Sequence, residues 1–231
     1  MYKVRRRIFP FLLMVISISL SAQDFSADRD LLDAYLRNDM KTWKGLIDTA
    51  STTAHTLAYE YGYCAALMDV NKTAAQPYVA RFRKHVEGLK GKLSPGHYEM
   101  YMSAVYVYEL RLHESFHPAK SLSLARESVK KAPSDPLTLT YCGMALFYAP
   151  KPFGDKKEAL QLFLKAERLF AAPKWKHCWW RAAAMMYIAQ CYDKQGEREK
   201  AIAQCETILT EYPSYAYIHD TYLPGLRTAT R

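Results

Sequence analysis

The chain contains 231 residues, of which 50% are hydrophobic and 24% are charged. This composition excludes a disordered or collagen-like protein and provides enough apolar material for one continuous core. The net charge is +9, but Lys3 and Arg5–Arg7 supply four of these nine charges and leave the remainder at +5. Basic and acidic residues alternate in that remainder, as in Glu197-Arg198-Glu199-Lys200, which indicates a solvated helix surface rather than a nucleic-acid footprint.

The first 22 residues have the pattern of a secretory signal peptide. A basic segment, Met1–Arg7, precedes a short apolar run from Ile8 to Leu20, and small residues follow at Ser21-Ala22. This order predicts cleavage after Ala22 and a periplasmic or secreted mature protein. The apolar run is too short to span a membrane comfortably, and an uncleaved anchor is the alternative.

The rest of the chain shows the periodicity of helices. Apolar residues recur at helical spacing, and no strict strand-like alternation persists beyond a few residues. Loop signals interrupt the pattern regularly, as at Ser94-Pro95-Gly96, Pro133–Pro136 and Gln195-Gly196. Asp155 is a candidate helix cap, with Glu158 reaching back to form a capping box. The pattern predicts an all-α chain of antiparallel helical hairpins.

The segment from Trp180 to Pro213 has the spacing of a repeated hairpin. Ala189 and Ala201 lie twelve residues apart, with Tyr192 and the turn residue Gly196 between them. Small residues let two helices approach closely, and Pro213 cannot continue the second helix. With Ile188-Ala189 standing where that motif has Leu-Gly, this segment resembles a tetratricopeptide repeat.

Similar spacing occurs upstream in degenerate form. Gly62 and Ala74 are also twelve residues apart, Gly143 and Ala159 are four residues further apart than that, and Ser121 begins another second helix. The small residues that begin the second helices are Ala74, Ser121, Ala159 and Ala201, separated by 47, 38 and 42 residues. The usual period is 34, so the helices or loops are longer than in a standard repeat.

The resemblance implies a right-handed α-superhelix of about four hairpins over residues 51–213. Residues 23–50 are expected to form an atypical N-terminal helix pair that begins with "DLLDAYL". Residues 214–231 are expected to form a capping helix, from Tyr215 to Leu223, and a tail. Terminal units differ from internal ones because nothing stacks on their outer faces.

In the family that the chain resembles, the first helix of each hairpin lines a concave groove that binds extended peptides. The resemblance places these residues on or near that groove: Tyr59, Tyr63, Tyr106, Met144, Phe147, Tyr148, Met186 and Gln190. Aromatic side chains offer a large contact area at low entropic cost. The alternative is that individual tyrosines pack between helices. Met186 and Gln190 stand where chaperone-binding members carry a lysine/asparagine clamp, so no such clamp is expected in the last repeat.

The segment His113-Glu114-Ser115-Phe116-His117 spells H-E-x-x-H. On a continuous helix, this pattern holds zinc with two imidazoles and supplies glutamate as a general base. Pro118 follows directly and disfavours helical conformation at His117. The repeat spacing also puts this segment at a turn, so we predict no metal site that uses His113, Glu114 and His117.

Five cysteines lie in the chain, and none forms a C-x-x-C pair, which excludes a zinc ribbon or a thioredoxin site. We expect them to be small buried residues on helices. If a disulfide forms after export, Cys191 and Cys205 are the candidate pair, because their helices are expected to pack together. Trp175, Trp179 and Trp180 are expected to seal the junction before the last repeat.

These observations predict a non-catalytic, exported binding or assembly protein in the periplasm of a Gram-negative bacterium. A protein or peptide partner would dock in the concave groove, and no cofactor, nucleic acid or membrane span after cleavage is expected. Two alternatives remain open at this point. One is a metal-dependent hydrolase that uses the HESFH segment, and the other is a carbohydrate-binding module that stacks sugars on its aromatic residues.

Overall fold

The computed structural model describes residues 25–113 and 118–228, so the predicted signal peptide and Glu114–His117 lie outside the described residues. Within those ranges every regular element is helical, which confirms the all-α prediction. None of the described helices is both long enough and apolar enough to cross a membrane.

The helices begin and end close to the loops predicted from the sequence. The helices are α1 (Phe25–Leu36), α2 (Met40–Thr49), α3 (Leu57–Val70), α4 (Lys72–Gly88), α5 (His97–Leu112), α6 (Pro118–Lys131), α7 (Pro136–Tyr148), α8 (Lys156–Phe170), α9 (Trp179–Lys194), α10 (Arg198–Glu211) and α11 (Leu223–Thr228). A 3₁₀ turn, η1 (Pro173–Trp175), precedes α9, and a π-helix, η2 (Tyr217–Tyr222), runs directly into α11. The C-terminal cap is therefore longer than the predicted Tyr215–Leu223.

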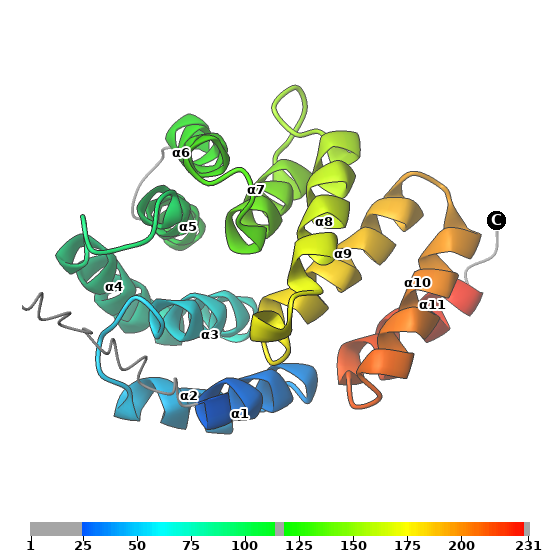
Figure 1. The fold of residues 1–231 in the computed structure, drawn as a ribbon, viewed down its shortest axis with the longest axis horizontal. Coiled ribbons are helices and arrows are strands. Elements are labelled where there is room, and N and C mark those ends of the chain that lie inside the picture. Colours follow the sequence, from blue (N-terminus) through cyan, green and yellow to red (C-terminus); the bar gives the residue numbers. More distant parts are fainter. Residues whose placement is uncertain (1–24, 114–117, 229–231) are drawn as a thin grey trace, which may run out of the picture.

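The helices form two layers that follow one another around a curve (Figure 1). The odd-numbered helices α3, α5, α7 and α9 contact one another in sequence and make the inner layer. The even-numbered helices α4, α6, α8 and α10 each pack against the odd-numbered helix that precedes them. Consecutive pairs are thus stacked side by side, with α1 and α2 lying below α3 (Figure 1).

The two layers differ in how apolar residues are distributed. α7, with the sequence PLTLTYCGMALFY, is buried on nearly all sides. α4 instead buries a single stripe, formed by Ala75, Val79, Phe82 and Val86. A helix that is apolar all round belongs inside, whereas one with a single apolar stripe covers a core and faces solvent with its other side. This difference explains why the odd-numbered helices occupy the centre.

Aspartate side chains cap α7 and α8, and the cap of α8 is at the predicted position, Asp155. Asp135 caps α7 by accepting hydrogen bonds from the backbone N–H groups of Leu137 and Thr138. Asp155 caps α8 in the same way. Glu158 does not complete the predicted capping box, because its carboxylate accepts two hydrogen bonds from Arg126 on α6 at 2.8 and 2.9 Å.

Small residues allow inner helices to approach large side chains, as the repeat spacing predicts. A Cβ atom added at Gly62 would lie 2.2 Å from the Trp43 ring, and one at Gly143 would lie 2.7 Å from the Phe163 ring. Ala159, Ala189 and Ala201 are fully buried. The exception is Ala74, which is exposed while Ala75 is buried, so the small anchor of the first predicted hairpin is wrong by one residue.

α5, the helix that precedes the H-E-x-x-H segment, ends before the first histidine of the motif. α5 ends at Leu112, and His113 has a φ angle of 62°, in the left-handed region. α6 begins at Pro118. His113 therefore terminates a helix instead of starting the single turn that a zinc-binding pair requires.

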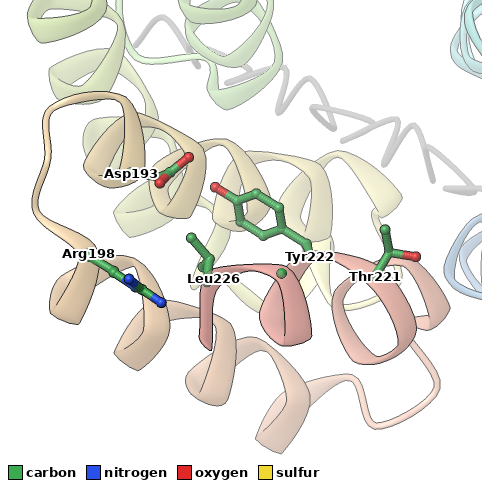
Figure 2. Close-up of a pocket in the computed structure, with 6 residues that line it drawn as sticks. Asp193, Arg198, Thr221, Tyr222 and Leu226 are labelled. Carbon is green, nitrogen blue, oxygen red and sulfur yellow. The ribbon is translucent and has the colours of Figure 1, made fainter. Parts of the chain in front are cut away.

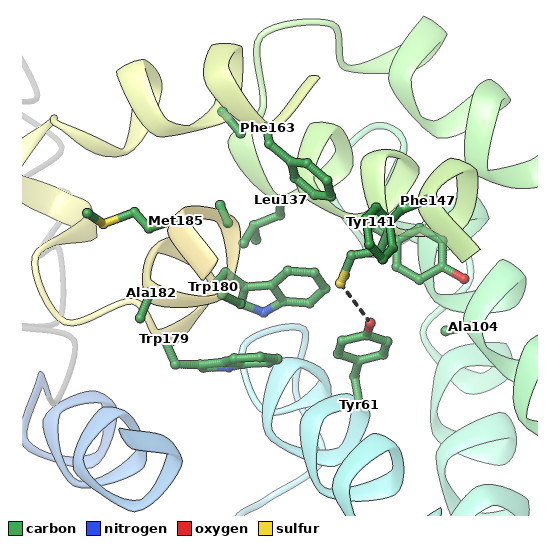
Figure 3. Close-up of a cluster of buried hydrophobic side chains, with 14 of the residues drawn as sticks. Tyr61, Ala104, Leu137, Tyr141, Phe147, Phe163, Trp179, Trp180, Ala182 and Met185 are labelled. Carbon is green, nitrogen blue, oxygen red and sulfur yellow. Dashed lines mark hydrogen bonds between the residues drawn. The ribbon is translucent and has the colours of Figure 1, made fainter. Parts of the chain in front are cut away.

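The array closes through its N-terminal helix. α1 packs against α9, and Tyr35 of α1 lies with its ring centroid 5.0 Å from that of Trp179. Trp179 and Trp180 fill the centre together with Tyr61, whose ring stacks on Trp180 at 4.7 Å (Figure 3). The tryptophans thus pack at the meeting point of α1, α3 and α9, a wider role than the predicted junction before the last hairpin.

Candidate functional site

The residues predicted to line the groove do not form one continuous surface. Tyr59, Tyr63, Met144 and Phe147 are buried in the core. Their predicted place on an open groove is wrong, and the alternative of packing between helices holds for them, because large side chains fill the space between the inner helices. Met144 illustrates this, since its sulfur accepts a hydrogen bond from the buried hydroxyl of Tyr61 at 3.9 Å (Figure 3).

Tyr63 and Tyr106 each contact side chains of the outer, even-numbered helices. Tyr63 packs edge-on against Tyr78 of α4, with ring centroids 4.9 Å apart. Tyr106 lies between two cations, with Lys120 Nζ 4.5 Å and the Arg83 guanidinium 5.4 Å from its ring centroid. Neither tyrosine belongs to a shared surface with the residues of α7 and α9.

The remaining predicted residues meet where α7 ends and α9 passes beside it. We call the group Tyr148, Met186, Tyr187, Gln190 and Tyr217 the aromatic face. Tyr148 is 67% exposed, and its hydroxyl lies 3.1 Å from that of Tyr187. Tyr217, which is 41% exposed, is hydrogen-bonded by the side chain of Gln190. The face is uncharged and combines exposed rings with polar hydroxyl and amide groups.

Buried residues hold the aromatic face in position from behind. The Tyr187 ring stacks on Phe163 of α8 at 5.2 Å and meets Phe147 of α7 at 5.7 Å. Tyr215 donates a hydrogen bond to the sulfur of Met186 at 3.3 Å. Rigid support of this kind lets an exposed ring bind a partner without first losing conformational freedom.

The hydroxyls of Tyr187 and Tyr217 stay protonated at neutral pH. Burial raises the pKa of Tyr187 well above its usual value, and the neighbouring hydroxyl of Tyr148 raises it further. Burial also raises the pKa of Tyr217, with the hydrogen bond from Gln190 acting in the opposite direction. Both hydroxyls are therefore neutral, and each can donate and accept a hydrogen bond, as pairing with peptide N–H and C=O groups requires.

Sequence reasoning missed Tyr187 and Tyr217. Tyr187 was within reach, because it lies three residues before Gln190 and so shares a helix face with it. Tyr217 carried no comparable signal, since it lies in the C-terminal cap outside the repeat spacing. Its position depends on how η2 folds back onto α9.

A depression lies beside the aromatic face, between the end of α9 and the C-terminal cap (Figure 2). It has a volume of about 300 Å³ and is lined by Asp193, Arg198, Thr221, Tyr222, Gly225 and Leu226. The carboxylate of Asp193 and the hydroxyl of Tyr222 point toward each other across it (Figure 2). Tyr222 also stacks on Tyr217 at 5.7 Å, which makes the depression continuous with the aromatic face.

Metal-ligating and nucleophilic groups are dispersed in the described part of the chain. No three His, Cys, Asp or Glu side chains within residues 25–113 and 118–228 gather closely enough to hold a metal ion. The five cysteines carry free thiols, and all but Cys178 are buried. Cys191 and Cys205 lie on the packed helices α9 and α10 but are not joined there.

Comparison with known proteins returns no match to the chain among family models, curated proteins or solved structures.

Proposed function

We propose that this chain is a non-catalytic binding protein built of degenerate tetratricopeptide-type hairpins in a right-handed superhelix. It is exported by its N-terminal leader and docks a peptide segment or protein surface on the aromatic face. The observation that carries this proposal is the 67% exposure of Tyr148 beside Tyr187 and Gln190, on a base of buried aromatic rings.

The chemistry of the face suits a polypeptide partner. Exposed tyrosine rings contribute contact area with few rotatable bonds, and tyrosine is enriched among the residues that dominate binding energy. The Gln190 amide and the tyrosine hydroxyls can hydrogen-bond to peptide N–H and C=O groups. The face carries no charge of its own, so affinity should depend weakly on salt.

Site-specific photo-crosslinking tests this proposal. A photoreactive phenylalanine analogue at position 148, in the full chain produced in its native host, should give a discrete adduct with a polypeptide. A synthetic peptide matching the crosslinked segment should then bind the purified protein, as measured by fluorescence anisotropy. Tyr148→Ala and Tyr217→Ala should each weaken this binding by about tenfold or more, which is typical of central tyrosine contacts.

The matched control is Val70, which is apolar and 79% exposed but is the last residue of α3 and does not belong to the aromatic face. The analogue at position 70 should give no adduct, and Val70→Ala should leave the affinity unchanged. Equal crosslinking from positions 70 and 148 would indicate non-specific contact and contradict the proposal.

One alternative has structural support, because exposed rings such as those of Tyr148 and Tyr217 can also stack on sugars. A glycan array with the same variants separates the two functions: glycan binding that Tyr148→Ala abolishes, without a crosslinked polypeptide, would replace a peptide partner with a carbohydrate. The hydrolase alternative depends on Glu114 and His117. Stoichiometric zinc in the purified protein that His113→Ala removes would overturn the non-catalytic proposal.

A further inference from the structure

A separate cavity lies beside Trp179 and Trp180 at the start of α9. Its volume is about 390 Å³, within the range of small-molecule sites. Five separate parts of the chain line it: α1, the start of α3 with the loop before it, α5 with its preceding loop, the start of α7, and residues 173–180. Because five segments distant in sequence line it, the cavity arises from the tertiary fold and not from a few neighbouring surface side chains.

One wall of the cavity is polar and internally hydrogen-bonded. Asp28 Oδ1 accepts a hydrogen bond from the Tyr59 hydroxyl at 2.5 Å and lies 2.9 Å from His55 Nε2. His55 Nε2 is also 3.0 Å from the Tyr59 hydroxyl. Although burial raises the pKa of Asp28, its hydrogen bonds to His55 and Tyr59 outweigh this and lower it overall. The hydrogen bond to Asp28 raises the pKa of His55.

A second histidine of the lining, His97, is also held by a carboxylate. His97 Nε2 lies 3.1 Å from Asp135 Oδ2, the same aspartate that caps α7. Asp135 stands behind His97 and does not line the cavity. Both imidazoles are thus oriented by carboxylates that are already hydrogen-bonded.

Positive groups outnumber negative ones around the cavity. Among the described lining residues, Asp28 is the single acidic side chain, whereas Lys174, Lys176, His55, His97 and His177 can all carry positive charge. Lys174 is positioned by Trp175, with its Nζ 5.0 Å from the ring centroid. The first residues of α9, Trp179 and Trp180, also lie here, so the positive end of a 16-residue helix dipole faces the same region.

The rest of the lining is apolar and firmly packed. Leu31, Leu137, Tyr101 and Trp180 are buried, and Ala58 contributes a small side chain that leaves space. Cys178 lies among them, but burial raises the pKa of its thiol to about 12, which makes it a poor nucleophile. The chemistry of the cavity is therefore that of binding: an apolar slot with cationic groups at its rim.

We propose that this cavity binds a small organic carboxylate with a planar apolar body. The carboxylate would lie near the histidines and the rim lysines, and the apolar body would lie against Ala58, Leu137 and Trp180. Asp28 is paired with His55 and accepts a hydrogen bond from Tyr59, so the positive charge left for a ligand comes mainly from Lys174 and Lys176. The ligand would also contact α1 directly, and so would hold the N-terminal helix to the rest of the fold.

Calorimetric titration of the purified full chain with phenylacetate and with phenylacetamide tests the proposal. The two probes have nearly the same shape, but the amide has no charge. Phenylacetate should bind at one site with a sub-millimolar Kd, and phenylacetamide should bind about tenfold more weakly or not at all, because a hydrogen bond to a charged group is the stronger one. Inorganic phosphate, which has charge but no apolar body, should also bind at least about tenfold more weakly.

Three variants locate the binding. Ala58→Leu should abolish it by filling the slot, and Lys174→Gln with Lys176→Gln should weaken it by about tenfold. Lys157→Gln, an exposed lysine on α8, should leave the Kd unchanged and serves as the matched control. The lysine variants lie at the surface and keep the test valid if Ala58→Leu fails to fold.

Equal affinity for phenylacetate and phenylacetamide would overturn the proposal, as would the absence of any binding. It would also fail if phosphate bound as tightly as phenylacetate, or if the lysine variants bound phenylacetate like the wild type. These outcomes leave the aromatic face untouched, because none of the mutated residues belongs to it.

Discussion

The hydroxyl of Tyr35 lies 2.5 Å from the hydroxyl of Tyr215, although 180 residues separate them in the chain. Tyr215 donates its own proton to the sulfur of Met186, so Tyr35 is the donor in this pair. A hydrogen-bonded chain therefore runs from α1 through the C-terminal cap to α9. It ties the two ends of the helical array to each other and to the aromatic face.

Removing this contact should loosen the closure of the array. Tyr35→Phe keeps the ring and deletes the donated hydrogen bond, so we expect the free energy of unfolding in urea to fall by about 1 kcal/mol. Tyr215→Phe should cost a similar amount or more, since it also loses the bond to Met186. A double-mutant cycle should show that the two losses are not additive. Strict additivity would mean that the hydroxyls do not interact in solution.

Gly62 should tolerate no larger side chain. An added methyl group would lie 2.2 Å from the Trp43 ring and 2.9 Å from the Trp179 ring, so Gly62→Ala should lower the free energy of unfolding by about 1–3 kcal/mol. Gly45 is the matched control, because it lies in α2 with open space around it. Gly45→Ala should raise the same quantity by about 0.5–1 kcal/mol. Thermal and urea unfolding both measure this contrast, and equal effects at the two glycines would refute the packing described for Trp43.

The Asp28–His55 pair should make stability depend on pH at both ends of a window. His55 has a raised pKa in the folded state, so its contribution is complete below its ordinary pKa of 6.5 and is lost as the pH rises through the folded value. Asp28 has a lowered pKa, so its contribution is complete above 3.8 and is lost as the pH falls through the folded value. His55→Gln should flatten the alkaline side of the stability profile, as measured by urea unfolding across pH. An unchanged slope on that side would show that the pair does not form.

The cysteines should react slowly in the folded protein. Burial raises the pKa of Cys142 and Cys191 to about 12 and that of Cys205 to about 11, so little thiolate exists near neutral pH. A thiol-reactive dye should titrate all five cysteines in concentrated guanidinium but few of them in buffer. A count of three in guanidinium, for protein isolated from its native compartment without reductant, would instead reveal a disulfide such as Cys191–Cys205.

Much of the fold could be predicted because it depends on local signals. The helix starts at Asp135 and Asp155 and the helix break before Pro118 follow from residues close in sequence. The close approach at Gly62 and Gly143 follows from the spacing of small residues. The position of Ala75 instead of Ala74 shows the limit of that spacing, since one residue changes which side of a helix is buried.

The site was harder to predict because it depends on contacts between distant segments. Tyr59 and Tyr63 occupy the first-helix positions that suggested a groove, yet α1 and α4 cover them. The aromatic face exists because the segment around Tyr217 folds back onto Gln190. The cavity likewise combines Asp28 with residues 173–180. No short sequence pattern indicates these contacts between distant segments.

The contact between α1 and the C-terminal region also has a consequence for the order of events during synthesis. α1 is synthesised well before its partners Trp179 and Tyr215, because 180 residues separate Tyr35 from Tyr215. Until then α1 can pack against the adjacent α2, where Tyr35 meets Trp43, but the side that contacts α9 stays uncovered. The other hairpins can form by short-range contacts. The contacts of α1 with Trp179 and Tyr215 therefore form only after most of the described helices have been synthesised.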